Sequence, residues 1–311
     1  MDRSLSDAHK VLHGKGHMRL RFDTTVLRLL EGAIDLHIHS APDVYPRILN
    51  DIELARQAKE MGMRAIVIKN HFAQTADRAQ LASDEADFPV FGGIALNLSV
   101  GELNHHAVEV ALKLGAKIVW LPTLHSQRFV RDKMHVANLA GEIGEDIRGI
   151  YLLKEDGSLR EELYTIFDLI AKWDVALATG HVSIEEAKVA VREATATGVK
   201  KIVVTHPLAS FLNYSVEAMK EILDLGATYL EHVYNDTTRQ VAHPIQVRDL
   251  YEGIRAIGAK HCVMSTDSGQ WLNPVPVQQM GIYIKDMLNL GLSEEEIRIM
   301  VADNPARVLG I

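Results

Sequence analysis

The sequence contains one cysteine, Cys262, among its 311 residues. A single cysteine excludes an intramolecular disulfide, which fits a reducing compartment. The chain also lacks an apolar run of about 18 or more residues, the length that a membrane-spanning helix needs. Its first residues are polar and do not form the apolar core of a secretion signal. We therefore expect a cytoplasmic protein with no membrane partner.

Positive charge is also in deficit. The chain has 33 lysines and arginines against 41 aspartates and glutamates, a net charge of −8. This balance argues against nucleic acid or an anionic membrane as the main partner. The composition is otherwise ordinary for a globular protein, with 47% hydrophobic and 24% charged residues. The length suits one barrel-sized domain with modest additions, or two small domains.

Short apolar runs of strand length recur along the chain. Such near-continuous runs are typical of parallel strands that are buried on both faces. Amphipathic segments of helical period separate them, and two segments begin with capping boxes, at Ser183 and Ser293. The predicted strands are residues 33–38, 65–68, 90–96, 118–121, 175–179, 201–205, 228–231 and 262–266.

This repeat predicts a closed (β/α)₈ barrel of the α/β class. An open doubly wound sheet is the alternative, but no Gly-x-Gly-x-x-Gly follows a strand, which weakens a dinucleotide-binding version. We expect residues 1–32 to form a helical extension over the N-terminal end of the barrel, and residues 33–311 to form the barrel. Residues 122–174 are a predicted insertion, with a candidate flap at 123–145 and a strand with a tight turn from 149.

Unusual polar residues gather where the predicted strands end. In such a barrel the active site lies at the C-terminal ends of the strands. Residues two apart on a strand face the same side, so His37 and His39 both point into the lumen. His181 follows the fifth strand, His206 the sixth and Asp267 the eighth. The sequence therefore predicts that these five side chains meet.

These residue types suit a divalent metal ion. Two imidazoles on one strand hold a borderline-soft ion such as zinc, with manganese and iron as alternatives. His181 and His206 can complete the coordination of one ion or extend it to two. Such an ion lowers the pKa of bound water to about 7, and Asp267 can bind the ion and accept the proton. The cluster therefore predicts metal-assisted hydrolysis at neutral pH.

At these residues the chain resembles the amidohydrolase superfamily. The match includes Asp-Leu-His-Ile-His at residues 35–39, His181, His206, Thr266-Asp267 and the Asn-Pro-Ala-x-x-Leu-Gly tail at residues 304–310, in the expected order. The resemblance implies a distorted (β/α)₈ barrel with one or two divalent metals. It also implies hydrolysis of amide, ester or phosphoester bonds in small molecules, and barrels of this kind often form homo-oligomers.

The same resemblance implies roles for single residues. His37 and His39 would bind the more buried metal, and Asp267 would bind metal and act as general base. His181 and His206 would bind the second metal, or His206 would orient the substrate. Members with two metals usually bridge them with a carboxylated lysine or a glutamate from the fourth strand. Here that strand ends in Trp-Leu-Pro-Thr at residues 120–123, so the bridge has no obvious source.

Lys69, at the end of the second strand, is the candidate substitute. We expect it to carry a bridging carbamate, or to remain a cation that binds an anionic substrate. His71 shares its facing and could replace a metal ligand or contact substrate. Arg47, His125, Tyr234 and Trp271 are further candidates for substrate binding. Arg47 could fork a carboxylate or phosphate, or pair with a nearby aspartate.

The leading hypothesis is hydrolysis of a small amide, lactam, lactone or related ester. A mononuclear, metal-dependent, non-oxidative decarboxylase or lyase is the alternative, favoured by the missing fourth-strand ligand. A phosphoesterase of the polymerase-and-histidinol-phosphatase type also opens with His-x-His. It usually ends with Asp-x-His, where this chain has Asp-Ser-Gly at 267–269. A non-catalytic metal sensor is the remaining hypothesis.

Overall fold

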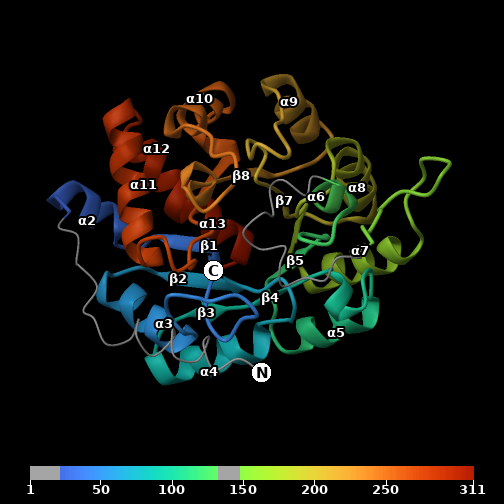
Figure 1. Ribbon diagram of the computed structural model, residues 1–311, viewed down its shortest axis with the longest axis horizontal. Helices are drawn as coiled ribbons and strands as arrows, with labels where there is room; N and C mark the ends of the chain where they lie inside the picture. The colour runs from blue at the N-terminus through green and yellow to red at the C-terminus, as the bar shows by residue number, and fades with distance from the viewer. Residues whose placement is uncertain (1–21, 132–147) are drawn as a thin grey trace.

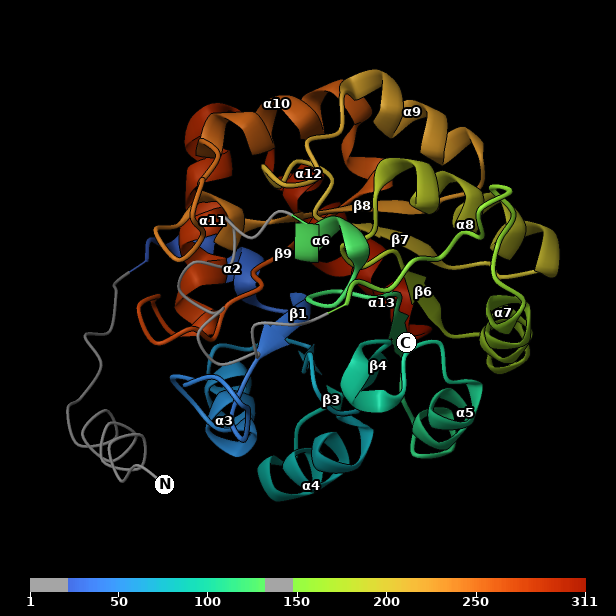
Figure 2. The ribbon, with the colours of Figure 1, turned by 45° about the vertical axis from the view of Figure 1, so that its right-hand side comes forward.

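The computed structural model describes residues 22–131 and 148–311. Helices surround a central set of parallel strands (Figures 1 and 2). The strands are β1 Ile34–His39, β2 Ala65–Lys69, β3 Val90–Phe91, β4 Gly93–Ala95, β5 Ile118–Trp120, β6 Ala176–Ala178, β7 Ile202–Thr205, β8 Tyr229–Val233 and β9 Cys262–Ser265. The α-helices are α2 Thr24–Leu30, α3 Asp51–Glu60, α4 Ala76–Ala86, α5 His105–Lys113, α6 Gln127–Arg131, α7 Glu162–Trp173, α8 Ile184–Thr197, α9 Val216–Asp224, α10 Val247–Ile257, α11 Pro276–Leu290, α12 Glu294–Arg298 and α13 Asn304–Leu309.

The strands follow one another around a barrel in chain order. β1 to β3 form one parallel sheet, and β4 to β9 form another. The backbone N–H of Asp267 donates to the His37 carbonyl at 2.8 Å, and that of His39 donates to the Ser268 carbonyl at 2.7 Å. These bonds join the end of β1 to the segment after β9, which brings the two edges of the barrel together.

The third predicted strand, residues 90–96, is divided at Gly92. The Thr75 hydroxyl accepts from the Gly93 N–H at 2.9 Å, and the Thr75 N–H donates to the Gly93 carbonyl at 2.9 Å. A Cβ on Gly92 would lie 2.5 Å from the Thr75 carbonyl group, so only glycine allows this approach. Thr75, in the loop before α4, therefore uses the backbone hydrogen-bonding groups of Gly93 that a neighbouring strand would otherwise use. As a result, β3 and β4 are separate strands.

One hydrophobic cluster fills the barrel lumen. Ile34, Leu36 and Trp120 pack there with Val308 and Leu309 of α13. The C-terminal helix therefore closes the barrel at the end opposite the polar strand ends. Outward strand residues pack against the ring helices, and the capping boxes predicted at Ser183 and Ser293 begin α8 and α12.

The predicted N-terminal extension is described only from residue 22. Its helix α2 buries Val26, Leu29 and Leu30 and packs beside α11 on the outside of the barrel (Figure 1). Residues 1–21 of the extension lie outside the described residues. None of the helices in the described ranges is long and apolar enough to cross a membrane.

The predicted insertion, residues 122–174, contains a helix of the ring. α7 packs between α5 and α8, so only the part before it is an addition to the barrel. The expected strand from 149 consists of isolated bridges, Ser126 to Ile150 and Leu153 to Leu159. Residues 132–145 of the candidate flap lie outside the described residues.

Candidate metal centre

The first strand is irregular where it carries the two histidines. The register of β1 against β2 shifts between Asp35 and Ile38, which marks a β-bulge or similar irregularity. Leu36 packs in the lumen core, yet the adjacent His37 also reaches the site at the strand ends, and Ile38 packs outward. Strict alternation would place Leu36 and His37 on opposite faces. The irregularity re-aims His37, as bulges near active sites often do.

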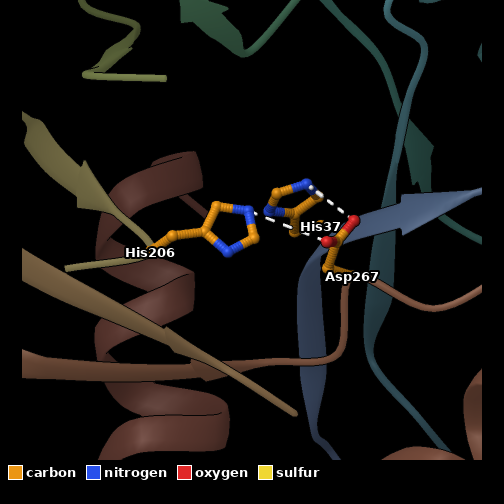
Figure 3. A group of neighbouring side chains, drawn as sticks. All are labelled: His37, His206 and Asp267. Carbon is orange, nitrogen blue, oxygen red and sulfur yellow. Dashed lines mark ion pairs between the residues drawn. The ribbon is translucent and has the colours of Figure 1, made fainter. Parts of the chain in front are cut away.

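His37, His206 and Asp267 converge at the polar end of the barrel (Figure 3). Their candidate ligand atoms all lie within 4.8 Å of one another, and all three residues are buried. His37 Nε2 lies 3.2 Å from Asp267 Oδ1, and His206 Nε2 lies 3.7 Å from Asp267 Oδ2. His39 Nε2 lies 3.0 Å from Asp267 Oδ1. The structure therefore brings together four of the residues that the sequence predicted.

Two carboxylates orient His37 and His206 through the Nδ1 atoms of their rings. Glu231 Oε2 lies 3.2 Å from His37 Nδ1, and both Asp236 carboxylate oxygens lie 3.1 Å from His206 Nδ1. A carboxylate that accepts from Nδ1 fixes the imidazole with Nε2 facing the site. Sequence reasoning did not identify these partners. An acidic residue inside the apolar run of β8, Glu231, was the available signal.

The charges around His37 shift its pKa in opposite directions. Burial and the Lys69 charge lower this pKa, while Asp267 and Glu231 raise it further, to about 9. Burial raises the pKa of Asp267, but His37 and His39 hold it well below its usual range. Asp267 is therefore an ionised carboxylate among histidines, as a metal ligand must be.

Backbone strain is located at two of the candidate ligands. His206 has φ 52° and Asp267 has φ 48°, both in the left-handed region that non-glycine residues rarely adopt. The Asn235 side-chain amide donates to Asp267 Oδ2 at 3.2 Å. Asp35 accepts from the Thr266 hydroxyl at 2.6 Å and from its N–H at 3.1 Å. These bonds hold the segment before Asp267 against β1, so Asp35 has a positioning role.

Lys69 is fully buried beside the cluster. Its Nζ lies 2.9 Å from His37 Nε2 and 5.4 Å from the centre of the Trp120 ring. No carboxylate of the described residues lies within 4.0 Å of Lys69 Nζ, although buried lysines are normally paired. Burial lowers the pKa of Lys69 to about 8, against the effect of Asp267 and Glu231.

His71 and His181 extend the cluster toward solvent. The His71 ring stacks on His39 at 4.7 Å, and its Nδ1 lies 2.9 Å from the Thr123 hydroxyl. The His181 ring lies 5.2 Å from His206 and 6.0 Å from His71. Burial holds the pKa of both His71 and His181 well below the usual range, so both are neutral imidazoles.

Unpartnered nitrogens show that the cluster fits a cation. Within the described ranges, His39 Nδ1, both ring nitrogens of His181 and His206 Nε2 are buried with no hydrogen-bond partner. Buried polar atoms almost always have one. Imidazole nitrogens and carboxylate oxygens are the ligands that zinc, manganese and iron accept. The donor set therefore fits a divalent metal ion.

His39, His206 and Asp267, together with His71 and His181, line a cavity of about 450 Å³, a volume suited to a small molecule. Arg47, His71 and Trp271 line this cavity, as predicted for substrate-binding residues. His125 and Tyr234 are not among its lining residues. His125 is buried near the Phe72 ring at 6.3 Å, and the Tyr234 hydroxyl donates to Asp286 of α11 at 2.6 Å. The structure therefore brings three of the five predicted residues to the cavity.

A protein family matches most of the chain. The family is described as "Family of unknown function (DUF6282)", and the match spans residues 32–231. The chain belongs to this family. The matched range contains His37, His39, Lys69, His181 and His206, whereas Asp267 lies beyond it. A comparison with curated proteins gives no match.

Solved structures match the fold over almost the whole chain. An amidohydrolase from Pseudomonas aeruginosa is 14% identical with a TM-score of 0.56, over 92% of this chain and 99% of that one. An organophosphorus hydrolase from Deinococcus radiodurans is 14% identical with a TM-score of 0.53, over 91% and 94%. A dihydroorotase is 15% identical with a TM-score of 0.53, over 90% and 69%. These likenesses show the fold: the chain forms a distorted (β/α)₈ barrel, which confirms the predicted fold.

Proposed function

We propose that this chain is a metal-dependent hydrolase that cleaves an amide, lactam, lactone or related ester in a small molecule. The convergence of His37, His206 and Asp267, of which His206 and Asp267 line a small-molecule cavity, carries this proposal. The similar structures support it, since they include an amidohydrolase, an organophosphorus hydrolase and a dihydroorotase.

The metal would be held by His37, His39, His206 and Asp267, with His181 available to a second ion. When bound, a divalent ion supplies a hydroxide nucleophile near neutral pH and polarises the scissile carbonyl. Zinc is the ion that this ligand set favours, with manganese and iron as alternatives.

The protein groups around that centre have separate tasks. Asp267 is ionised, and its carboxylate lies within the cluster, so it can accept a proton from the attacking water and pass it to the leaving group. His206 is held by Asp236 and presents Nε2 to the cavity, where it can ligate or donate to the substrate. His71 and Trp271 line the same space and would contact the substrate.

Lys69 would carry a carbamate in the active protein. An ammonium 2.9 Å from His37 Nε2 would repel a cation bound there, and no described carboxylate neutralises it. Addition of carbon dioxide to the neutral amine, with loss of one proton, replaces that positive charge with an anionic metal ligand. Intact-mass measurement in bicarbonate would show a gain of one carbon dioxide per chain, absent in Lys69→Met. An unmodified lysine in metal-loaded crystals would contradict this assignment.

Chelation tests the proposed function. The full-length protein is assayed against a panel of lactones, esters and cyclic amides, before and after treatment with a chelator and then with added zinc or manganese. We expect hydrolysis of at least one class, its loss on chelation and its return with metal. Hydrolysis that survives complete metal removal, or none across the panel, would contradict the proposal.

A non-oxidative decarboxylase is the second candidate. It is favoured by β5, the fourth strand position, which ends at Trp120 packed against Lys69 and supplies no bridging carboxylate. Release of carbon dioxide from an aromatic acid, without hydrolysis of any ester or amide, would establish it in place of the hydrolase.

A further inference from the structure

Arg47 is a buried arginine whose hydrogen-bonding capacity is mostly unused. It is only 5% exposed, and its Nε donates to Asp43 Oδ2 at 2.7 Å. Its terminal nitrogens, Nη1 and Nη2, make no hydrogen bond to any of the described residues. Both belong to a side chain that lines the cavity above the metal cluster. The N–H groups of an arginine so deeply buried normally have hydrogen-bond partners, so Nη1 and Nη2 are available to donate to a ligand.

The backbone fixes Arg47 relative to the catalytic carboxylate. Arg47 forms an antiparallel bridge with Gln270, and the Ile48 N–H donates to the Gly269 carbonyl at 3.0 Å. Gln270 in turn donates from its side-chain amide to the Asp267 carbonyl at 2.8 Å. The loop that carries Arg47 is therefore attached to the segment that carries Asp267, and a substrate bound by both would be held in one orientation.

Asp43 orients the guanidinium through Nε and does not bind the paired terminal nitrogens, Nη1 and Nη2. The Asp43 side chain is fully buried, and it contacts Nε, the nitrogen nearest the aliphatic stem. The guanidinium carbon lies 6.0 Å from the centre of the Tyr45 ring. The paired Nη groups match the two oxygens of a carboxylate or phosphate.

Large apolar side chains form part of the cavity wall. Leu124, Phe129 and Phe211 line it, and Trp271 and Leu272 line it although they are 50% and 60% exposed. Exposed large apolar side chains beside a cavity favour contact with an apolar part of a ligand.

We propose that Arg47 binds an anionic group of the substrate, so that the enzyme acts on small acids with an apolar body. This inference rests on the proposed hydrolase and names its substrate class. The anion is a carboxylate or a phosphate bound through Nη1 and Nη2, and the scissile bond of the same molecule lies over the metal cluster.

Calorimetric titration of the metal-loaded, full-length protein tests this. The probes are phenylacetate, phenyl phosphate and the uncharged phenylacetamide. Three variants are compared with the wild type. Arg47→Lys keeps the positive charge but lacks the paired terminal nitrogens, and Asp43→Asn/Arg47→Gln removes both buried charges together. Arg192→Gln removes an exposed arginine of α8 and serves as the control. The double variant avoids leaving a buried aspartate unpaired.

We expect one anion to bind at least roughly tenfold more tightly than phenylacetamide in the wild type and in Arg192→Gln. The preferred anion then identifies the group as carboxylate or phosphate. The preference should disappear in the double variant and fall in Arg47→Lys. Equal binding of acid and amide, no binding of either anion, or an unchanged preference in both Arg47 variants would overturn the inference. Binding requires no turnover, so a failure here is separate from the absence of hydrolysis that would overturn the proposed function.

Discussion

At the scale of single residues, Asp267 connects the parts of the candidate centre. Its carboxylate lies within 3.2 Å of His37 and His39 Nε2 and accepts from Asn235. Its left-handed backbone turns the side chain back over the strand ends. The position is strained, and such strain is found at functional sites when neighbouring contacts enforce it.

Replacing Asp267 by asparagine should separate folding from activity. Asparagine has the same shape and tolerates the left-handed region, so the fold should survive. The loss of the charge removes a metal ligand and a proton acceptor, and hydrolysis should fall by about 10³-fold. Steady-state kinetics and circular dichroism check the two statements, with Asp224→Asn in α9 as an exposed control. Near-full activity of Asp267→Asn would remove the role we assign to it.

His232 gives a separate prediction on stability. It is buried at 1% exposure on β8, and neither ring nitrogen has a partner among the described residues. Burial lowers its pKa from 6.5 to about 4. Between these values the unfolded chain binds more protons than the folded one, so the free energy of unfolding falls as pH drops.

His232→Leu should reduce that pH dependence. Between pH 7 and pH 5 the wild type should lose about 2 kcal/mol more of its unfolding free energy than the variant. Urea unfolding at both pH values measures the difference. Equal losses in the two proteins would show that His232 does not titrate as its burial requires.

The histidines and Asp267 could be predicted because each follows an apolar strand in the same repeat. Their carboxylate partners could not. Glu231 and Asp236 contact His37 and His206 across different elements, and only the packed barrel defines these pairs. Tyr234 follows β8 like a site residue, but its hydroxyl reaches Asp286 on α11 instead of the cavity.

At the scale of elements, the junction between β1 and the segment after β9 is the critical one. Gly269 has φ 127°, and a Cβ there would lie 1.8 Å from the His39 carbonyl oxygen. The same segment pairs with Arg47 and carries Asp267. Close backbone approach at this one glycine therefore sets the spacing of three candidate site residues.

Gly269→Ala should displace this segment from β1. We expect a loss of about 3 kcal/mol in unfolding free energy and a large loss of hydrolysis, because His39 and Asp267 move apart. Gly157→Ala is the matched control, since Gly157 has φ 80° but no atom within 4 Å of its Cβ position. Its cost should be about 1 kcal/mol from backbone strain alone. Chemical unfolding compares the two, and equal costs would contradict the account of the junction.

Strand and helix positions were predictable from apolar runs and capping boxes, and the two irregularities were not. The shift in β1 and the break at Gly92 depend on the register with β2 and on the approach of Thr75. Neither contact can be recognised from the residues next to it in the sequence. The shift matters most for function, because it places His37 beside His39 without moving Leu36 from the lumen.

At the scale of the whole molecule, the barrel separates stability from chemistry. α13 and the lumen cluster fill one end, and the metal ligands and cavity occupy the other. The repeat along the chain sufficed to predict this division, and the similar solved structures confirm the fold. The homo-oligomer, the cytoplasmic location and the choice of zinc stay predictions, since they depend on surfaces and conditions outside one chain.

The central claim is a divalent metal at His37, His206 and Asp267. An anomalous difference map from crystals grown with zinc, with data collected on both sides of the zinc absorption edge, tests it directly. We predict a zinc peak about 2.0–2.2 Å from an imidazole nitrogen of His37 and a carboxylate oxygen of Asp267. The absence of zinc among these residues, with zinc bound elsewhere or nowhere, would contradict the account.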